Sequence, residues 1–264
     1  MLLFGNAPML QVSVKGSGPD LVMLHGWGMH SAVWSDWAET LASEFRVHCV
    51  DLPGHGSSLT VAKDTLEAWA AEVMQVVPEG AWWLGWSLGG LLAQQAVFMF
   101  PGALRGLVLV AATPRFVKAD DWPHGVDSGV FDQFARQLKD DPERTLMRFL
   151  ALQVRGAQDG AATLRRLRSR LQQRPLAQAT ALRTGLDILS GTDLREVTAD
   201  SKLPMHWLLG ERDTLISPDM AADLDGEAHV VPGAGHAPFL SHPEDCTTCL
   251  YGWLLDGGIQ HAAG

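Results

Sequence analysis

The sequence predicts an α/β fold in which a mostly parallel central sheet is flanked by helices. Short apolar runs typical of strands alternate with helix-length amphipathic segments along most of the chain. The 264 residues, 47% of them hydrophobic, suffice for one large core. A Gly-x-Ser-x-Gly stretch at 85–89 lies between an apolar run and a helix-like run, as is typical of an enzyme built on such a sheet.

The expected strands are apolar almost throughout, as parallel strands covered on both faces are. The exception is the first expected strand, in which apolar and polar residues alternate as in an antiparallel edge strand. They fall at 10–15, 21–24, 47–50, 81–84, 106–110, 205–209 and 229–231. Helix starts are expected at capping-box patterns in 64–67 and 241–244, and at Ser217-Pro218, where proline follows an N-cap serine.

One region interrupts the alternation. Residues 113–198 carry little strand signal and are rich in Leu, Ala, Arg and Gln. We therefore expect a core domain of residues 1–112 and 199–264, with a helical lid (113–198) inserted after the sixth strand. Between 141 and 186 nine arginines stand against three acidic residues, a net charge of +6 that leaves −16 for the rest. A solvated helix face is the ordinary explanation of such a run, but its nearly uniform sign favours partner binding.

Composition excludes several classes of protein function. A net charge of −10 argues against nucleic-acid binding, and no apolar run approaches the roughly 20 residues of a membrane span. Residues 1–8 lack a basic leader with an apolar core, so we expect a cytoplasmic monomer with no membrane partner. Cys246 and Cys249 form a C-x-x-C pattern without a second pair, which indicates helix packing, so neither a metal nor a cofactor is expected.

Ser87 is the candidate nucleophile. It follows the strand at 81–84, and the glycines two residues before and after it permit a tight, strained turn that exposes the hydroxyl. The amide of Leu88 then lies at a helix start, where free N–H groups can bind a developing oxyanion.

A nucleophilic serine needs a base that is oriented by a third group. Asp213 and His236 follow the two late strands, where α/β enzymes carry their catalytic loops, and they come in the order Ser, acid, His. His25 and His55 are better explained as loop-stabilising residues. The acids that compete with Asp213 are Glu211, Asp193 and Asp219.

A second oxyanion donor is expected from the amide of Trp27. It lies in the glycine-rich loop His25-Gly26-Trp27-Gly28 that follows the strand at 21–24. A plain turn after a strand is the alternative explanation of this loop.

The motifs together resemble the α/β-hydrolase superfamily over the whole chain. They are His-Gly-Trp-Gly at 25–28, Asp-Leu-Pro-Gly-His-Gly-Ser at 51–57, Gly-Trp-Ser-Leu-Gly-Gly at 85–90 and Gly-His-Ala-Pro-Phe at 235–239. More narrowly, the chain resembles the BioH-type pimeloyl-acyl-carrier-protein methyl ester esterases of biotin synthesis. This resemblance rests on Trp86, on the segment 236–243 and on the segment Arg144-Thr145-Leu146-Met147-Arg148-Phe149-Leu150-Ala151-Leu152-Gln153.

This resemblance implies a serine carboxylesterase that hydrolyses the methyl ester of pimeloyl-acyl-carrier protein. It implies Ser87, Asp213 and His236 as the catalytic triad. The implied substrate contacts are Trp27, Ser87, Leu88, Phe149, Leu150, Ala151, Leu152, Gln153 and His236. An acidic acyl carrier protein would bind lid arginines, for which the candidates are Arg144, Arg148, Arg155 and Arg165.

The residues alone leave two other functions open. One is a broad-specificity carboxylesterase, lactonase or C–C hydrolase that acts on small molecules. The other is a binding protein that keeps the fold without turnover, which a complete triad disfavours.

Overall fold

A seven-stranded sheet forms the centre of the molecule in the computed structural model, which describes residues 9–256. The strands lie in the order β1-β3-β2-β4-β5-β6-β7. They are β1 (Val12–Lys15), β2 (Asp20–Leu24), β3 (Arg46–Val50), β4 (Ala81–Trp86), β5 (Leu104–Val110), β6 (Met205–Gly210) and β7 (Glu227–Val231). Each of the seven expected strands is present, and the predicted α/β architecture is confirmed.

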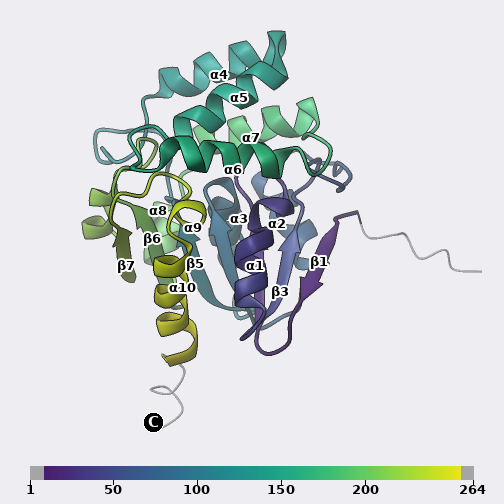
Figure 1. Cartoon of the computed structure of the whole chain (residues 1–264), viewed down its shortest axis with the longest axis vertical. Coiled ribbons are helices and arrows are strands. Elements are labelled where there is room, and N and C mark those ends of the chain that lie inside the picture. Colours follow the sequence, from purple (N-terminus) through teal and green to yellow (C-terminus); the bar gives the residue numbers. More distant parts are fainter. Residues whose placement is uncertain (1–8, 257–264) are drawn as a thin grey trace, which may run out of the picture.

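Only β1 runs against its neighbour. It pairs antiparallel with β3, Val12 opposite Val50, whereas every other pairing is parallel. The carboxyl ends of β2, β4, β6 and β7 therefore meet at one edge of the sheet, at the top of Figure 1, and the loops that follow these strands lie next to one another there.

Helices cover both faces of the sheet. In Figure 1, α1 (Ser35–Leu41) and α10 (Pro243–Tyr251) lie in front of it, and α2 (Leu66–Met74), α3 (Leu88–Met99) and α8 (Arg195–Ala199) lie behind. Short elements complete the layers: η1 (Ser31–Trp34), η2 (Pro218–Asp223), α9 (Pro238–Ser241) and a π-helical turn, η3 (Gly252–Asp256).

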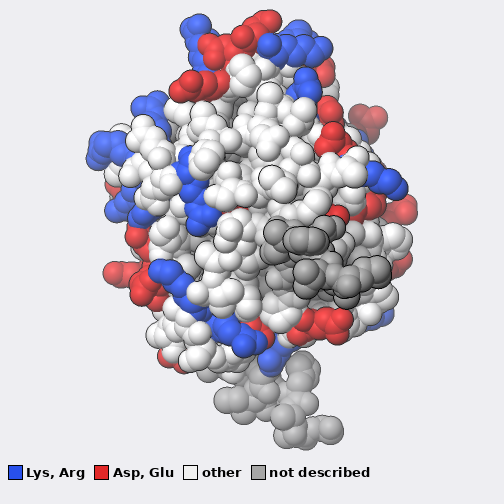
Figure 2. Space-filling model, turned by 90° about the vertical axis from the view of Figure 1, so that its right-hand side faces the viewer, with Lys and Arg blue, Asp and Glu red and all other residues white. Residues whose placement is uncertain are grey.

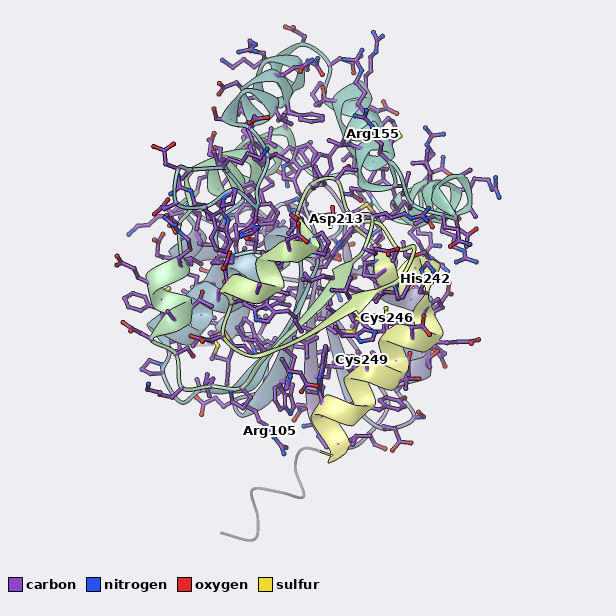
Figure 3. All side chains as sticks on the ribbon, turned by 90° about the vertical axis from the view of Figure 1, so that its left-hand side faces the viewer. Arg105, Arg155, Asp213, His242, Cys246 and Cys249 are labelled. Carbon is purple, nitrogen blue, oxygen red and sulfur yellow. The ribbon has the colours of Figure 1, made fainter. Side chains whose placement is uncertain are left out.

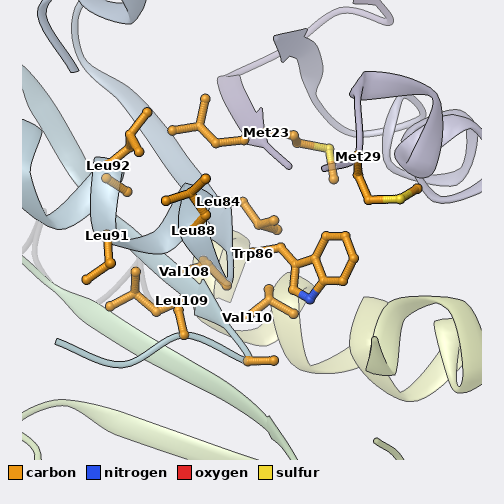
Figure 4. Packing of buried hydrophobic residues seen from close by; sticks show 14 of the residues in the cluster. Met23, Met29, Leu84, Trp86, Leu88, Leu91, Leu92, Val108, Leu109 and Val110 are labelled. Atoms are coloured by element: carbon orange, nitrogen blue, oxygen red, sulfur yellow. The ribbon is translucent and has the colours of Figure 1, made fainter. Parts of the chain in front are cut away.

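The core lies between the sheet and these helices. Figure 4 shows its centre, where side chains of β4, β5 and α3 pack around Leu84 and Trp86, both of them without solvent exposure. Burial on both faces explains why β4 and β5 are almost continuously apolar. This packing fixes the end of β4, from which Ser87 projects.

Four helices between β5 and β6 cover the carboxyl edge of the sheet, and we refer to residues 113–198, which contain them, as the lid. The four helices are α4 (Ser128–Asp140), α5 (Pro142–Gln153), α6 (Gly160–Leu171) and α7 (Ala179–Gly191). The insertion follows β5, which is the fifth strand of residues 9–256 and not the expected sixth, because only one edge strand precedes β2.

Two helices start later than their capping patterns indicate. Thr65, not Asp64, is the N-cap of α2, and its hydroxyl accepts a hydrogen bond from the Ala68 amide at 3.2 Å. Helix α10 starts at Pro243 with His242 at its N-cap and no side-chain cap, so Ser241 instead ends α9. Ser217 caps η2 as expected, with its hydroxyl 3.3 Å from the Asp219 amide.

None of the helices between residues 9 and 256 combines the length and apolar character that crossing a membrane requires. Cys246 and Cys249 lie on α10 (Figure 3) as free thiols. Over the same residues no cluster of three or more His, Cys, Asp or Glu side chains is arranged to hold a metal ion.

Candidate active site

Ser87 lies at a sharp turn between β4 and α3. Its backbone has φ 54° and ψ −116°, a combination that non-glycine residues rarely adopt. The turn needs small neighbours: a Cβ on Gly85 would lie 2.4 Å from the Gly89 carbonyl oxygen, and one on Gly89 would lie 2.3 Å from that of Leu24. The two glycines thus let α3 start directly against β2 and β4, as a nucleophile elbow requires.

His236 and Asp213 meet in the loops after β7 and β6. The Nδ1 atom of His236 lies 2.7 Å from Oδ2 of Asp213, and the His236 and Asp213 side chains are 0% and 2% exposed. The other oxygen, Oδ1, accepts hydrogen bonds from the amides of Leu215 at 2.8 Å and Ile216 at 3.2 Å. The carboxylate is therefore held in place and holds the imidazole in turn.

The competing acid Glu211 has a different contact. Its Oε2 accepts a hydrogen bond from the Gly233 amide at 2.7 Å, which ties together the loops after β6 and β7. Asp193 pairs with Arg115 and Arg195, and Asp219 lies in the first turn of η2 with no bond to His236.

The elbow and the histidine loop are in direct contact. The indole Nε1 of Trp86 donates to the carbonyl oxygen of His236 at 2.7 Å, and Trp86 immediately precedes Ser87. Within residues 9–256 the Nε2 atom of His236 is buried without a hydrogen-bond partner, and the Ser87 hydroxyl is not bonded to it. This nitrogen is available to accept a proton, and such contacts often tighten only when substrate binds.

The two expected oxyanion donors are free. In the part of the chain that the structure describes, neither the Leu88 amide, at the start of α3, nor the Trp27 amide, in the loop after β2, donates to a turn, a loop or a side chain. The Trp27 side chain is fixed by the lid: its Nε1 donates to the Leu182 carbonyl oxygen at 2.8 Å, and its ring packs edge-on against Phe149 at 4.8 Å.

A small apolar cavity of about 10 Å³ adjoins Ser87. Apart from Ser87, only apolar side chains line it: Phe116, Val126, Val130, Phe131, Phe134, Phe149, Leu189 and Leu215. Most of these come from the lid and its flanking loops. Its lining suits a hydrocarbon group, because burying apolar surface is favourable by about 25 cal/mol per Å². The space itself holds little more than one water-sized group, so a longer chain requires the lining side chains to move apart.

Sequence reasoning found only Phe149 and Ser87 among these lining residues. Phe131 and Phe134 lie on α4, whose amphipathic pattern identifies an apolar face but not the cavity that this face covers. Trp86, which precedes the nucleophile, does not line the cavity and packs edge-on against Phe239 at 5.1 Å.

The expected contact segment 149–153 spreads around α5, because consecutive residues of a helix point in different directions. Phe149 lines the cavity, whereas Leu150 is buried without lining it and Ala151 is exposed. Leu152 lines an outer groove. Gln153 contributes its carbonyl oxygen, which accepts a hydrogen bond from the His236 amide at 3.0 Å.

That outer groove continues the cavity toward solvent. It shares Val126, Val130, Phe134 and Leu215 with the cavity. Its charged lining residues are Arg148, Arg155 and the ion pair between Lys118 and Asp127 at 3.9 Å. Figure 3 shows Arg155 in the lid, above the loop that carries Asp213. A chain that ends at Ser87 could therefore leave the enzyme past basic side chains.

The lid arginines fall into two groups. Arg166 donates to the Leu240 carbonyl oxygen, Arg170 pairs with Asp36, and Arg174 pairs with Asp51, so these three fasten the lid to the core. The expected partner-binding residues are exposed and form no ion pair within residues 9–256: Arg144, Arg148, Arg155 and Arg165. Basic and acidic groups are interspersed over the face that Figure 2 shows, so the charge of the lid is not gathered on that side.

His25 and His55 hold loops beneath the lid. His25 Nε2 accepts a hydrogen bond from the Leu52 amide at 3.0 Å, and His55 Nδ1 lies 2.9 Å from the Pro53 carbonyl oxygen. Burial, together with the charge of His55, lowers the pKa of His25 to about 3, and burial lowers that of His55 to about 4. Both rings are neutral at pH 7, in agreement with a loop-stabilising role.

Comparisons with known proteins agree with this geometry. The sequence matches the alpha/beta hydrolase family over residues 21–247. It is 42% identical over 260 residues to the pimeloyl-[acyl-carrier protein] methyl ester esterase of Stenotrophomonas maltophilia (strain R551-3), covering 97% of this chain and 99% of that protein. It is also 42% identical over 238 residues to the protein of that name from Yersinia enterocolitica, and the match covers 88% of this chain and 92% of that protein.

Solved structures show the same fold. A hydrolase from Oleispira antarctica superposes with a TM-score of 0.82 at 18% identity, covering 93% of this chain and 94% of its own. An esterase from Exiguobacterium antarcticum superposes with a TM-score of 0.80 at 22% sequence identity, and the match covers 92% of this chain and 94% of the esterase chain.

Proposed function

Because the chain belongs to the alpha/beta hydrolase family and, within it, to the pimeloyl-acyl-carrier-protein methyl ester esterases, we propose that it hydrolyses the methyl ester of pimeloyl-acyl-carrier protein. The products are pimeloyl-acyl-carrier protein and methanol. Residues 113–198 act as the lid over a core formed by the rest of the chain.

The proposed chemistry uses only groups of this chain and water. Ser87 attacks the ester carbonyl while Nε2 of His236 takes its proton, and Asp213 orients the imidazole and stabilises its charge. The amides of Trp27 and Leu88 donate to the oxyanion of the tetrahedral intermediate. His236 then protonates the departing methanol, and a water molecule attacks the acyl-enzyme with the same residues as base and oxyanion donors.

The observation that carries this proposal is the buried Asp213–His236 pair. Its Nε2 has no partner within residues 9–256, and the His236 backbone is bonded to Trp86, next to the strained turn at Ser87. In the described part of the chain, ring nitrogens of His30, His55 and His206 are also buried without a hydrogen-bond partner. It is therefore the bond to a buried carboxylate that distinguishes His236 as a general base. Strained backbone of this kind clusters at active sites, which supports a catalytic role for Ser87.

Recognition of the carrier protein is assigned to the exposed lid arginines. Arg144 and Arg148 are one turn apart on α5, and Arg148 and Arg155 line the groove that continues the cavity. An acidic carrier would approach these cations while the acidic core repels other orientations. The acyl chain would then pass along the groove to Ser87.

The test compares two substrates: methyl pimeloyl-carrier protein and a small soluble aryl ester. We expect Ser87→Ala to abolish hydrolysis of both, because the nucleophile is lost. The double variant Arg144→Glu/Arg148→Glu should lose at least about tenfold in kcat/KM on the carrier-bound ester, and its salt dependence should become shallower, with little change on the aryl ester.

Turnover by Ser87→Ala equal to that of the unchanged protein would refute the triad. Equal losses on both substrates in the arginine variant would indicate damage to the lid. A wild-type enzyme that cleaves the aryl ester but not the carrier-bound ester would instead be a small-molecule esterase.

A further inference from the structure

Asp51, at the carboxyl end of β3, joins three segments of the chain. Its carboxylate is fully buried. Oδ1 accepts a hydrogen bond from the Ser31 amide at 2.7 Å, and Oδ2 accepts from the Ser57 amide at 3.0 Å and from Nη1 of Arg174 at 2.9 Å. Ser31 closes the loop after β2, Ser57 belongs to the loop after β3, and Arg174 follows α6 of the lid.

The loop after β2 is the one that presents the Trp27 amide. Its first residue, His25, is held by the Leu52 amide, which donates to Nε2 at 3.0 Å. At the other end Ser31, the first residue of η1, is held by Asp51. Between them the loop bonds to itself through one turn, Met29 amide to Gly26 carbonyl oxygen, at 3.2 Å. The position of the Trp27 amide thus depends on the anchors at the two ends.

The lid touches this same loop directly. The indole of Trp27 donates to the Leu182 carbonyl oxygen on α7 at 2.8 Å, and His30 Nε2 lies 3.1 Å from the Leu171 carbonyl oxygen at the end of α6. Both lid partners are backbone carbonyls. Arg174 adds a charged side chain that reaches a carboxylate already bonded to the loop, so loop and lid share one anchor.

The charge of Arg174 matters because of where Asp51 lies. Burial acts to raise the pKa of this carboxyl, but hydrogen bonds from the Ser57 and Ser31 segments hold its pKa below the ordinary value, so it is an anion. A buried anion without a cation is strongly unfavourable. Without Arg174, water or a shifted loop would have to solvate Asp51, and the Ser31 end of the loop would move.

We propose that Arg174 is a positioning residue for the esterase reaction: through Asp51 it seats the lid against the loop that carries the Trp27 oxyanion donor. Arg174 itself does not touch the substrate. The inference rests on the proposed function of Trp27, and it makes the lid part of the catalytic framework as well as a cover.

The test is the kinetics of Arg174→Gln on a small aryl ester, which needs no carrier protein. We expect kcat to fall about tenfold with KM nearly unchanged, because small displacements of a catalytic donor act on the transition state. A trifluoromethyl ketone, which forms a tetrahedral oxyanion adduct with the serine, should lose affinity by the same factor as kcat/KM. Arg174→Lys, which keeps a cation on Asp51, should recover most of kcat.

The matched control is Arg170→Gln. It removes another ion pair between the lid and the core, with Asp36 on α1, which does not reach the loop after β2. We expect its kcat to equal that of the unchanged enzyme at a temperature where melting curves show every variant folded.

Equal losses in Arg170→Gln and Arg174→Gln, a rise in KM alone, or no recovery in Arg174→Lys would overturn the proposal. A wild-type protein without turnover would refute the esterase function itself. Normal wild-type turnover with an unchanged kcat in Arg174→Gln would refute only the role of Arg174.

Discussion

Ser87 shows how much one residue can be constrained by its neighbours. It is one of two non-glycine residues with positive φ among residues 9–256, the other being Ala111. Its amide donates to the Val110 carbonyl oxygen at 3.1 Å, and its own carbonyl oxygen accepts from the Gly90 amide at 2.9 Å. Such a conformation costs about 1–3 kcal/mol, which the surrounding sheet and helix must offset.

This strain predicts a difference between two inactive variants. Ser87→Ala removes the hydroxyl and keeps the strain, whereas Ser87→Gly also relieves it, because glycine adopts positive φ freely. We expect the free energy of unfolding of Ser87→Gly to exceed that of Ser87→Ala by about 1 kcal/mol, after the greater chain entropy of glycine is subtracted. Urea denaturation of both variants measures this difference in the free energy of unfolding. A Ser87→Gly variant less stable than Ser87→Ala would show that the turn is relaxed.

Among the elements, α5 links the lid to the catalytic loop. It starts at Pro142, carries Phe149 into the cavity, and ends at Gln153, whose carbonyl oxygen accepts from the His236 amide at 3.0 Å. Its start is set by Asp141, whose Oδ1 accepts from the Arg144 amide at 3.0 Å. A good N-cap therefore supports a helix with a contact at the active site.

We expect Asp141→Ala to lower the free energy of unfolding by about 1 kcal/mol, the usual loss when an N-cap carboxylate is removed. For a chain of this length the corresponding fall in Tm is about 2–4 °C. Asp140→Ala is the matched control, since Asp140 is the adjacent exposed carboxylate, at the end of α4. Calorimetry of the two variants tests this prediction. Equal Tm values for Asp141→Ala and Asp140→Ala would mean that the N-cap hydrogen bond is not formed.

At the scale of the whole molecule, buried neutral histidines tie stability to pH. His25 and His55 lie with ring centroids 5.1 Å apart beneath the lid, and burial lowers their pKa values to about 3 and about 4. In the unfolded chain both return to about 6.5. Below that pH the unfolded chain binds protons that the native protein does not, so acid favours unfolding.

The free energy of unfolding should therefore fall as the pH is lowered from about 6.5 toward 4, by about 1.4 kcal/mol per pH unit for each of the two histidines. Above about 6.5 these groups add no pH dependence. Urea titrations at pH 7.5, 6 and 5 measure how steeply the free energy of unfolding depends on pH. In His55→Gln this slope should fall by the contribution of one histidine. An unchanged slope in that variant would indicate that His55 is protonated in the native protein.

Much of this architecture could be predicted from the sequence, because buried parallel strands are apolar on both faces and the elbow at Ser87 needs its two glycines. The order of strands and loops along the chain predicts Asp213 and His236 as partners of Ser87. The strand patterns and the elbow are local signals, each contained within a few consecutive residues, whereas Asp213 and His236 follow from the order of elements along the chain.

The cavity could not be predicted in the same way. Its walls combine α4, α5 and loops that are far apart in sequence, so Phe131 and Leu215 carry no local sign of a shared surface. The arginines show the same limit: their sequence run is uniform, and only tertiary contacts separate Arg174, which meets a buried carboxylate, from Arg165, which remains exposed.

Helix α6 has a consequence for how such an enzyme can diverge. Arg166 and Arg170, one turn apart, and Arg174 beyond the helix end hold the lid to the body, while Arg165 and Arg168 face outward and form no ion pair within residues 9–256. Mutations can therefore accumulate on the outer side without loosening the lid. A lineage could adopt a new partner by drift at those two positions, with its attachment and its chemistry inherited unchanged.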